Sequence, residues 1–203
     1  MNNPEFDRWQ SRFAAPDYLF GKAPNAFLSA SASLLPRHGA ALAVADGEGR
    51  NGVFLAERGL DVLSIDFSPH AQAKARALAA ERGVALGVEQ ADLLNWAWPR
   101  AEFDVIAAIF IQFAPPAGRD AMFAGIQHAL KPAGLLLLEG YRPEQLAYKT
   151  GGPSQVENLY TRGLLEAAFG DFASLDIREY DSSIDEGGGH AGMSALIDLV
   201  GRK

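Results

Sequence analysis

Three glycines with the spacing Gly-x-Gly-x-x-Gly follow a short apolar run and precede an apolar helical pattern: Gly47, Gly49 and Gly52. A strand, a glycine turn and a helix in this order are typical of sites that hold nucleotide-like ligands in α/β proteins. Gly47 and Gly49 let the backbone turn sharply and approach a ligand closely. A helix that begins near Asn51 would point its free N–H groups at a phosphate or carboxylate. The stretch predicts a ligand with an anionic group; a turn that only connects two elements is the alternative.

An acidic residue, Asp66, ends the second apolar run of the chain. A carboxylate at this place can accept hydrogen bonds from both hydroxyls of a ribose. It could instead cap the following helix. Ser68 already supplies that cap, however, and Pro69 suits the first helical position. We therefore expect Asp66 to bind a ribose.

Three further residues suggest contacts to a nucleoside. Asp92 could accept a hydrogen bond from the amine of an adenine, or it could cap a turn. Phe67 and Phe110 could stack on the two faces of an adenine, or they could belong to the core. Arg50 could hold an anionic group of a ligand, or it could be a solvated arginine at the start of a helix.

The elements that must position these residues alternate between strands and helices from residue 25 to residue 139. Strands are expected at 40–45, 61–65, 84–89, 103–109 and 135–139. Helices are expected at 25–35, 51–58, 69–82 and 118–130. This alternation predicts right-handed crossovers and a mainly parallel, doubly wound, Rossmann-like α/β sheet.

The pattern changes after Gly140. We expect an irregular loop on the substrate side of the site at 141–160, a helix at 161–169, and two strands at 172–180 and 193–200 joined by 181–192. A connection of this kind joins antiparallel neighbours, so the sheet should end in an antiparallel hairpin. Residues 1–203 are interpreted as a single domain.

Residues 1–26 are rich in aromatic side chains without a clean period and contain several glycine and proline breaks. We interpret this segment as a loop-like flap over the site. A plain N-terminal helix against the edge of the sheet is the alternative. Three aromatic residues of the segment are candidate site residues: Trp9, Tyr18 and Phe20.

Composition excludes several classes of function. The chain has 203 residues, a net charge of −7 and no cysteine, which excludes disulfides, thiolate metal sites and a cysteine nucleophile. No metal is expected. No basic cluster and no long apolar run occur, so neither nucleic acid nor a membrane is an expected partner. A cytoplasmic protein with a small-molecule substrate is the expectation.

Ligands of open α/β sheets bind beyond the carboxyl ends of the strands. The residues that follow the five expected parallel strands are therefore the candidates for binding and catalysis. They are Asp46, Gly47, Glu48, Gly49, Arg50 and Asn51; Asp66, Phe67 and Ser68; Asp92 and Leu93; Phe110 and Gln112; and Tyr141 and Arg142.

Several motifs in a fixed order resemble one family over nearly the whole chain. They are Gly47-Glu-Gly-Arg-Asn51, Val62-Leu-Ser-Ile-Asp-Phe-Ser68, Ala91-Asp92, Phe103-Asp-Val-Ile with Phe110, and Lys131-Pro-Ala-Gly-Leu-Leu-Leu-Leu138. The set resembles class I S-adenosylmethionine-dependent methyltransferases. Tyr18-x-Phe-Gly-Lys-x-Pro-Asn-x-Phe-Leu28 and Gly151-Gly-Pro153 are similar to the small bacterial branch with tellurite-resistance-type and thiopurine-type enzymes.

The resemblance implies a seven-stranded methyltransferase fold and S-adenosyl-L-methionine as the cofactor. In most of the family an acidic residue stands two positions before the first motif glycine, where this chain has Ala45. Asp46 or Glu48 could meet the ammonium of the cofactor instead. The methionyl carboxylate is expected at the start of the helix near Asn51, and the aromatic residues of the flap are expected to shield the sulfonium.

The implied reaction is in-line transfer of a methyl group to a small-molecule nucleophile such as a thiol or a chalcogen oxyanion. If the nucleophile needs a base or an anchor, the candidates are His190, Tyr141 and Arg142. Two alternatives stay open: a protein that binds S-adenosylmethionine without catalysis, and an NAD-dependent oxidoreductase, whose fingerprint the glycines and Asp66 also satisfy.

Overall fold

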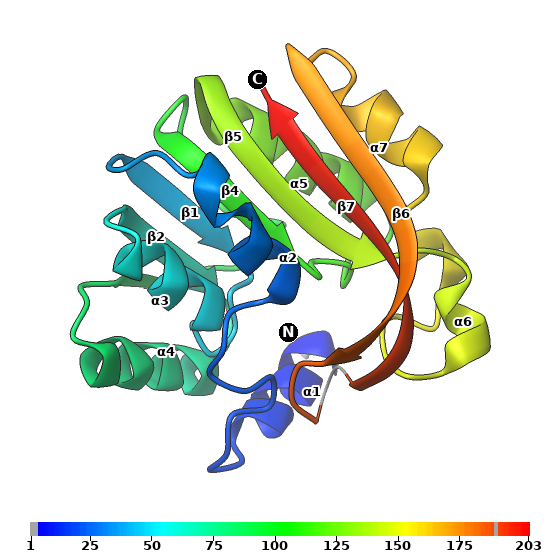
Figure 1. Ribbon diagram of the computed structural model, residues 1–203. Helices are drawn as coiled ribbons and strands as arrows, with labels where there is room; N and C mark the ends of the chain where they lie inside the picture. Colours follow the sequence, from blue (N-terminus) through cyan, green and yellow to red (C-terminus); the bar gives the residue numbers. More distant parts are fainter. Residues whose placement is uncertain (1–3, 189–190) are drawn as a thin grey trace.

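A computed structural model describes residues 4–188 and 191–203, and within them it contains one seven-stranded sheet with the order β3-β2-β1-β4-β5-β7-β6 (Figure 1). The strands are β1 (Ala40–Val44), β2 (Asp61–Asp66), β3 (Gly87–Gln90), β4 (Phe103–Ile109), β5 (Leu130–Tyr141), β6 (Ser174–Asp185) and β7 (Ala191–Arg202). The strand pairs from β3 to β5 are parallel, and β7 pairs antiparallel with both β5 and β6. The mainly parallel sheet with a C-terminal hairpin is thus confirmed.

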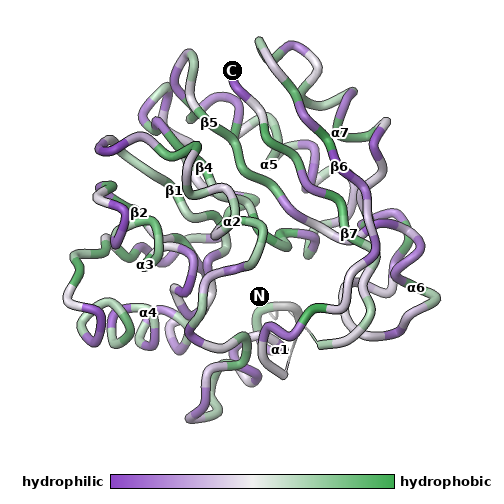
Figure 2. The backbone as a smooth tube through the Cα atoms, viewed as in Figure 1, coloured by the Kyte–Doolittle hydropathy of each residue, from purple (hydrophilic) through white to green (hydrophobic). Residues whose placement is uncertain are grey.

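Helices cover both faces of the sheet (Figure 1). The helices are α1 (Pro4–Phe13), α2 (Ala26–Ala30), α3 (Arg50–Glu57), α4 (Pro69–Arg82), α5 (Pro116–Ala129), α6 (Gln145–Tyr148) and α7 (Arg162–Phe169), with short 3₁₀ turns η1 (Ser31–Leu34) and η2 (Val156–Asn158). The core on one face joins the sheet to α5 and α7, and the core on the other face joins it to α2 and α3. Figure 2 shows apolar residues along the central strands.

Strand β4 illustrates why these residues form a central strand. Ile106 and Ala108 belong to the core under α5 and α7, whereas Val105 and Ala107 belong to the core under α3. All four are buried, because a parallel strand with helices on both sides needs apolar side chains on both of its faces.

Local signals in the sequence fix several helix ends, and the predicted cap at Ser68 is one of them. The side chains of Asn25, Ser68 and Thr161 accept hydrogen bonds from backbone N–H groups in the first turns of α2, α4 and α7, at 2.9, 3.2 and 3.2 Å. Gly83 ends α4 in the left-handed conformation with φ of 69°.

Two expectations about the ends of the chain were wrong. The segment 1–26 is not loop-like throughout, because Pro4–Phe13 is a helix. Phe6, Trp9 and Phe13 follow helical spacing and pack on Phe67 and on one another, so the helix buries an aromatic face. The expected connection 181–192 is largely strand, since pairing continues to Asp185 opposite Ala191. The extended hairpin curves toward α1 (Figure 1).

No helix within 4–188 and 191–203 combines the length and the apolar character that crossing a membrane requires.

Candidate functional site

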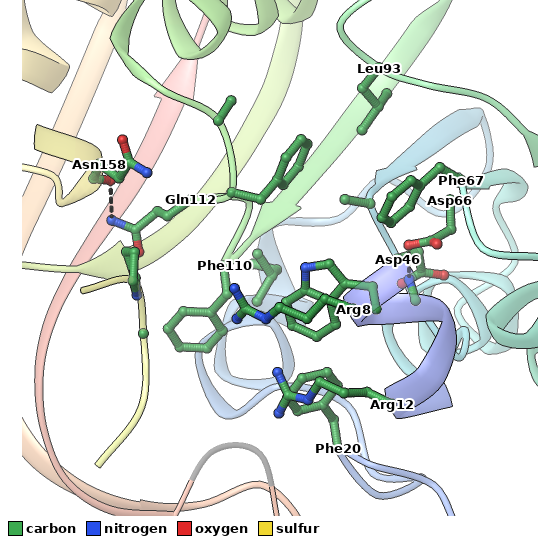
Figure 3. A pocket seen from close by; sticks show the side chains of 18 of the residues that line it. Arg8, Arg12, Phe20, Asp46, Asp66, Phe67, Leu93, Phe110, Gln112 and Asn158 are labelled. Atoms are coloured by element: carbon green, nitrogen blue, oxygen red, sulfur yellow. Dashed lines mark hydrogen bonds between the residues drawn. The ribbon is translucent and has the colours of Figure 1, made fainter. Parts of the chain in front are cut away.

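A cavity of about 570 Å³ lies beyond the carboxyl ends of the parallel strands (Figure 3). Its walls come from the ends of β1, β2, β4 and β5, from the turn after β3, from α1 and from the loop 151–155. The cavity brings together Trp9, Phe20, Asp46, Gly47, Arg50, Asn51, Asp66, Phe67, Asp92, Leu93, Phe110, Gln112 and Tyr141. Most of the predicted site residues therefore surround one space.

Packing within the protein accounts for two of the three glycines in the turn between β1 and α3. Gly47 has φ of 58° and lines the cavity. Gly49 has φ of 88°, but a Cβ there would lie 2.6 Å from the Cβ of Ala75 on α4. A Cβ on Gly52 would collide with the carboxylate of Asp46. The close approach at Gly49 and Gly52 is thus to the protein itself, and only Gly47 borders the cavity.

Asp66 holds the turn with both of its carboxylate oxygens. Oδ2 accepts a hydrogen bond from the Gly47 N–H at 3.0 Å, and Oδ1 accepts one from the Ser68 N–H at 2.8 Å. Burial raises the pKa of Asp66 to about 6. Each oxygen keeps a second lone pair, so Asp66 can still accept the hydroxyls of a ribose.

Asp46 and Glu48, the two candidates for the acid absent at Ala45, have different surroundings. Asp46 borders the cavity, accepts hydrogen bonds from the Gly52 N–H at 3.2 Å and the Ser64 hydroxyl at 2.7 Å, and has a pKa that burial raises to about 7. Glu48 lies outside the lining. Its carboxylate accepts the Leu19 N–H at 2.7 Å and pairs with Lys74 at 2.7 Å. Glu48 thus anchors the N-terminal segment to α4.

Two aromatic rings face the cavity from the ends of β2 and β4, the two strands that flank β1. Phe67 follows β2, and Phe6 of α1 packs edge-on against it at 5.4 Å between centroids. Phe110 follows β4, has φ of 54°, and lies 4.6 Å from the ring of Tyr141. A positive φ is rare for a residue with a bulky side chain and often marks a functional site. Asp92 accepts hydrogen bonds within its own turn, from the Leu94 N–H at 3.1 Å and from the side chain of Asn95 at 2.7 Å.

Gln112 ties the end of β4 to the end of β5. Its Nε2 donates to the carbonyl oxygens of Tyr141 at 2.9 Å and Asn158 at 3.1 Å, and its Oε1 accepts the Tyr141 N–H at 2.6 Å. Both ends of this amide are therefore used to hold the cavity wall.

Of the three catalytic candidates the structure describes two, Tyr141 and Arg142, and only one of these two lines the cavity. His190 lies outside the described residues. Tyr141 lines the cavity, but burial raises its pKa above the usual value, so the phenol stays protonated near neutral pH. Arg142 lies outside the lining, donates to the Leu196 carbonyl at 3.0 Å and pairs with Asp181.

Two other predicted contacts also lie outside the lining. The Tyr18 hydroxyl donates to the carbonyl of Lys74 at 3.0 Å, which fastens the N-terminal segment to α4. Ser68 caps α4, and its hydroxyl hydrogen-bonds to the side chain of Gln10 on α1. Both residues stabilise the N-terminal cover of the cavity.

Arg50 forms a buried ion pair. Its guanidinium lies 2.6 Å from Glu186, at the end of the β6–β7 hairpin, with side-chain exposures of 7% and 10%. Glu186 also accepts the side-chain amide of Asn25 at 3.0 Å and the Ala26 N–H at 2.9 Å. The pair clamps the hairpin to α2 and α3, and it neutralises Arg50.

Sequence reasoning missed two arginines of the lining, Arg8 and Arg12 on α1. Both stack on the ring of Trp9, at 5.3 and 4.6 Å from the guanidinium carbon to the ring centroid. A helical interpretation of residues 4–13 would have found them, because positions four apart lie on one face of a helix.

Residues 41–134 match the family model described as a methyltransferase domain. Among curated proteins, none matches the sequence of this chain. The range covered by the model includes the glycine turn, Asp66, Asp92 and Phe110.

Solved structures share the fold. A SAM-dependent methyltransferase from Methanosarcina mazei is 16% identical with a TM-score of 0.68, covering 84% of this chain and 95% of that one. TehB from Haemophilus influenzae is 14% identical with a TM-score of 0.68, and the alignment covers 98% of this chain and 67% of TehB. The [4+2]-cyclase SpnF is 19% identical with a TM-score of 0.67, covering 97% and 92%. These likenesses establish the seven-stranded methyltransferase fold.

The methyltransferase domain matched at residues 41–134, together with this fold, supports an enzyme. The cofactor that this domain implies is S-adenosylmethionine. The resemblance to the tellurite-resistance branch stays a prediction, since the likeness to TehB concerns the fold alone.

Proposed function

We propose that this protein transfers the methyl group of S-adenosylmethionine to a small-molecule nucleophile, such as a thiol or a chalcogen oxyanion, by in-line displacement. The observation that supports this proposal is a cavity in which residues suited to bind a nucleoside lie beside a wall of aromatic side chains. Its volume of about 570 Å³ is within the usual range of about 300–1,000 Å³ for small-molecule sites. Because α1 and the loop 151–155 border it, we expect a small acceptor.

The residues at the ends of β1 and β2 fit the cofactor. Asp66 retains acceptor capacity for the ribose hydroxyls, and Phe67 offers a face to the adenine. The first turn of α3 borders the cavity through Arg50 and Asn51, where helix N–H groups favour the methionyl carboxylate. Of the two candidates for the ammonium, we favour Asp46, because Glu48 is used by Leu19 and Lys74.

The chain contributes binding, orientation and exclusion of water. When bound, S-adenosylmethionine supplies a methyl group that is already activated on a sulfonium. Trp9, Phe20 and Phe110 surround the cavity with aromatic surface, which favours a cation and keeps water out. A thiolate or an oxyanion needs no general base, which agrees with a cavity whose described tyrosine, Tyr141, holds its proton.

We further propose that residues 1–203 act as one methyltransferase domain. Residues 1–26 cover the cofactor site, and the loop 141–160 forms the acceptor side. The supporting observation is that α1 and the stretch 151–155 line the same cavity as the strand ends.

Release of S-adenosylhomocysteine tests the proposal. Purified protein with S-adenosylmethionine and a panel of thiols, phenols, amines and oxyanions should release S-adenosylhomocysteine with at least one acceptor. Binding of the cofactor without release across the whole panel would favour a non-catalytic binding protein. Binding of NADH in its place would favour an oxidoreductase.

A further inference from the structure

The loop between β5 and α7 brings a side chain with an unused hydrogen-bond acceptor to the cavity. Asn158 is the last residue of η2, lines the cavity and is 9% exposed. Within the part of the chain that the structure describes, its Oδ1 is buried and has no hydrogen-bond partner. A buried amide oxygen without a donor costs free energy, and such groups are rare in native proteins unless they serve a function.

The backbone around Asn158 is fixed, although its Oδ1 is unused. The N–H of Asn158 donates to the carbonyl of Gln155 at 3.1 Å, and its carbonyl accepts Nε2 of Gln112 at 3.1 Å. The neighbouring carbonyl of Glu157 accepts the guanidinium of Arg119, on α5, at 2.9 Å. The side chain of Asn158 is therefore carried by a rigid wall of the cavity, which is what a binding group requires.

Asn158 lies far from the part of the cavity that the proposed function gives to the ribose. Figure 3 shows Asn158 beside Gln112 at one side of the cavity, and Asp46 and Asp66 at the other side. A donor for Oδ1 is thus expected from the methyl acceptor rather than from the ribose. The last side-chain torsion of asparagine is broad and roughly two-fold, so the amide can turn its oxygen toward a ligand.

We infer that Asn158 selects a methyl acceptor that carries an uncharged hydrogen-bond donor: a hydroxyl, an aromatic amine or an amide N–H. This inference rests on the proposed function. Oδ1 of Asn158 would accept the hydrogen bond, while Gln112 keeps the backbone of Asn158 in place. A fully ionised oxyanion has no proton to donate. The inference therefore favours a thiol with a separate donor group over a chalcogen oxyanion.

Benzenethiols with one ring substituent, as meta and para isomers, test the inference by titration calorimetry with protein saturated with S-adenosylhomocysteine. An amino substituent donates a hydrogen bond, a methyl group of similar size does not, and a methoxy group only accepts. Wild-type protein should bind at least one aminobenzenethiol about tenfold or more tightly than its methyl and methoxy analogues, because only the N–H satisfies the buried oxygen. The chain has no cysteine, so these thiols cannot form mixed disulfides with it.

Two variants of Asn158 separate the oxygen from the rest of the side chain. Asn158→Ala should lose the preference for the amino substituent, and Asn158→Asp should keep it, because aspartate retains an acceptor oxygen. Tyr160→Phe is the matched control and should keep the preference of wild-type protein. Among the described residues, the Tyr160 hydroxyl is also buried without a partner, but Tyr160 lies outside the cavity lining.

Each outcome has a separate meaning. Equal binding of the amino and methyl compounds by wild-type protein, or a preference that survives in Asn158→Ala, would overturn the inference. Loss of the preference in Asn158→Asp as well would assign the contact to the amide nitrogen and would overturn it too. Weaker binding of S-adenosylhomocysteine by Asn158→Ala would show that the cofactor is the partner of Asn158, with the same consequence. Failure of wild-type protein to bind S-adenosylhomocysteine would overturn the proposed function itself.

Discussion

Replacing Asp66 by asparagine should remove most of the protein's ability to recognise ribose hydroxyls. Each carboxylate oxygen of Asp66 already accepts one backbone N–H, from Gly47 or Ser68, and has one lone pair left for a hydroxyl. An asparagine keeps one oxygen as an acceptor and has an NH₂ group, a hydrogen-bond donor, in place of the other. The change costs at least one charge-assisted hydrogen bond to the ligand, about 1.5–3 kcal/mol, which is roughly 10- to 150-fold in Kd.

The assay compares adenosine with 2′,3′-dideoxyadenosine, which lacks both ribose hydroxyls. Wild-type protein should bind adenosine more tightly, and Asp66→Asn should abolish most of the difference. Because the ratio is measured within each variant, a general distortion of the turn affects both ligands and cancels. Since the pKa of Asp66 is about 6, the preference of wild-type protein for adenosine should also fall about tenfold between pH 7 and pH 5. An unchanged ratio in Asp66→Asn would refute the ribose role of this carboxylate.

Three further predictions concern stability, each measured as the free energy of unfolding in urea. Arg50→Met should cost about 3–5 kcal/mol, because it leaves Glu186 buried without its charged partner, and adding Glu186→Gln should recover part of the loss. The pKa of Asp46 is about 7 in the folded protein against 3.8 for the free group, so its contribution to the free energy of unfolding is present below pH 4 and is lost as the pH rises to 7. Asp46→Asn should therefore flatten the dependence of the free energy of unfolding on pH between pH 4 and pH 7. An unaltered slope would contradict the raised pKa. Gly49→Ala should destabilise the protein by more than about 2 kcal/mol, because a Cβ there meets Ala75 at 2.6 Å. Gly83→Ala should cost about 1 kcal/mol, because Gly83 also has a positive φ but its Cβ would meet open space. Equal losses would show that backbone strain alone, and not the contact with Ala75, determines the loss of stability.

Most of the parallel sheet could be predicted because its signals are local. Strand β4 was expected at 103–109 and has these bounds, since a run buried on both faces is apolar at nearly every position. The cap at Ser68, the proline after it and the left-handed Gly83 delimit α4 in the same way. Such features depend on residues close in sequence.

The hairpin was harder to delimit. The residues 181–185 are polar except for Ile184 and are at least partly exposed, and they form a strand through pairing with β7. The sequence of this stretch has no apolar alternation to indicate a strand, and the buried partner that Glu186 finds in Arg50 is distant in the chain.

The location of the site was predictable, but the use of each side chain was not. Glu48 and Asp46 look equivalent in the sequence, yet Glu48 anchors the N-terminal segment, whereas Asp46 borders the cavity. Arg8 and Arg12 share a face only in a helix, whereas the sequence favours a loop-like flap over a helix for residues 1–26. Roles of this kind depend on contacts between distant parts of the chain.

Titration of wild-type protein with S-adenosylhomocysteine, and separately with NADH, tests the central claim most directly. The cavity at the ends of β1 and β2 should bind one S-adenosylhomocysteine per chain and should not bind NADH. Binding of NADH without binding of S-adenosylhomocysteine would contradict the account.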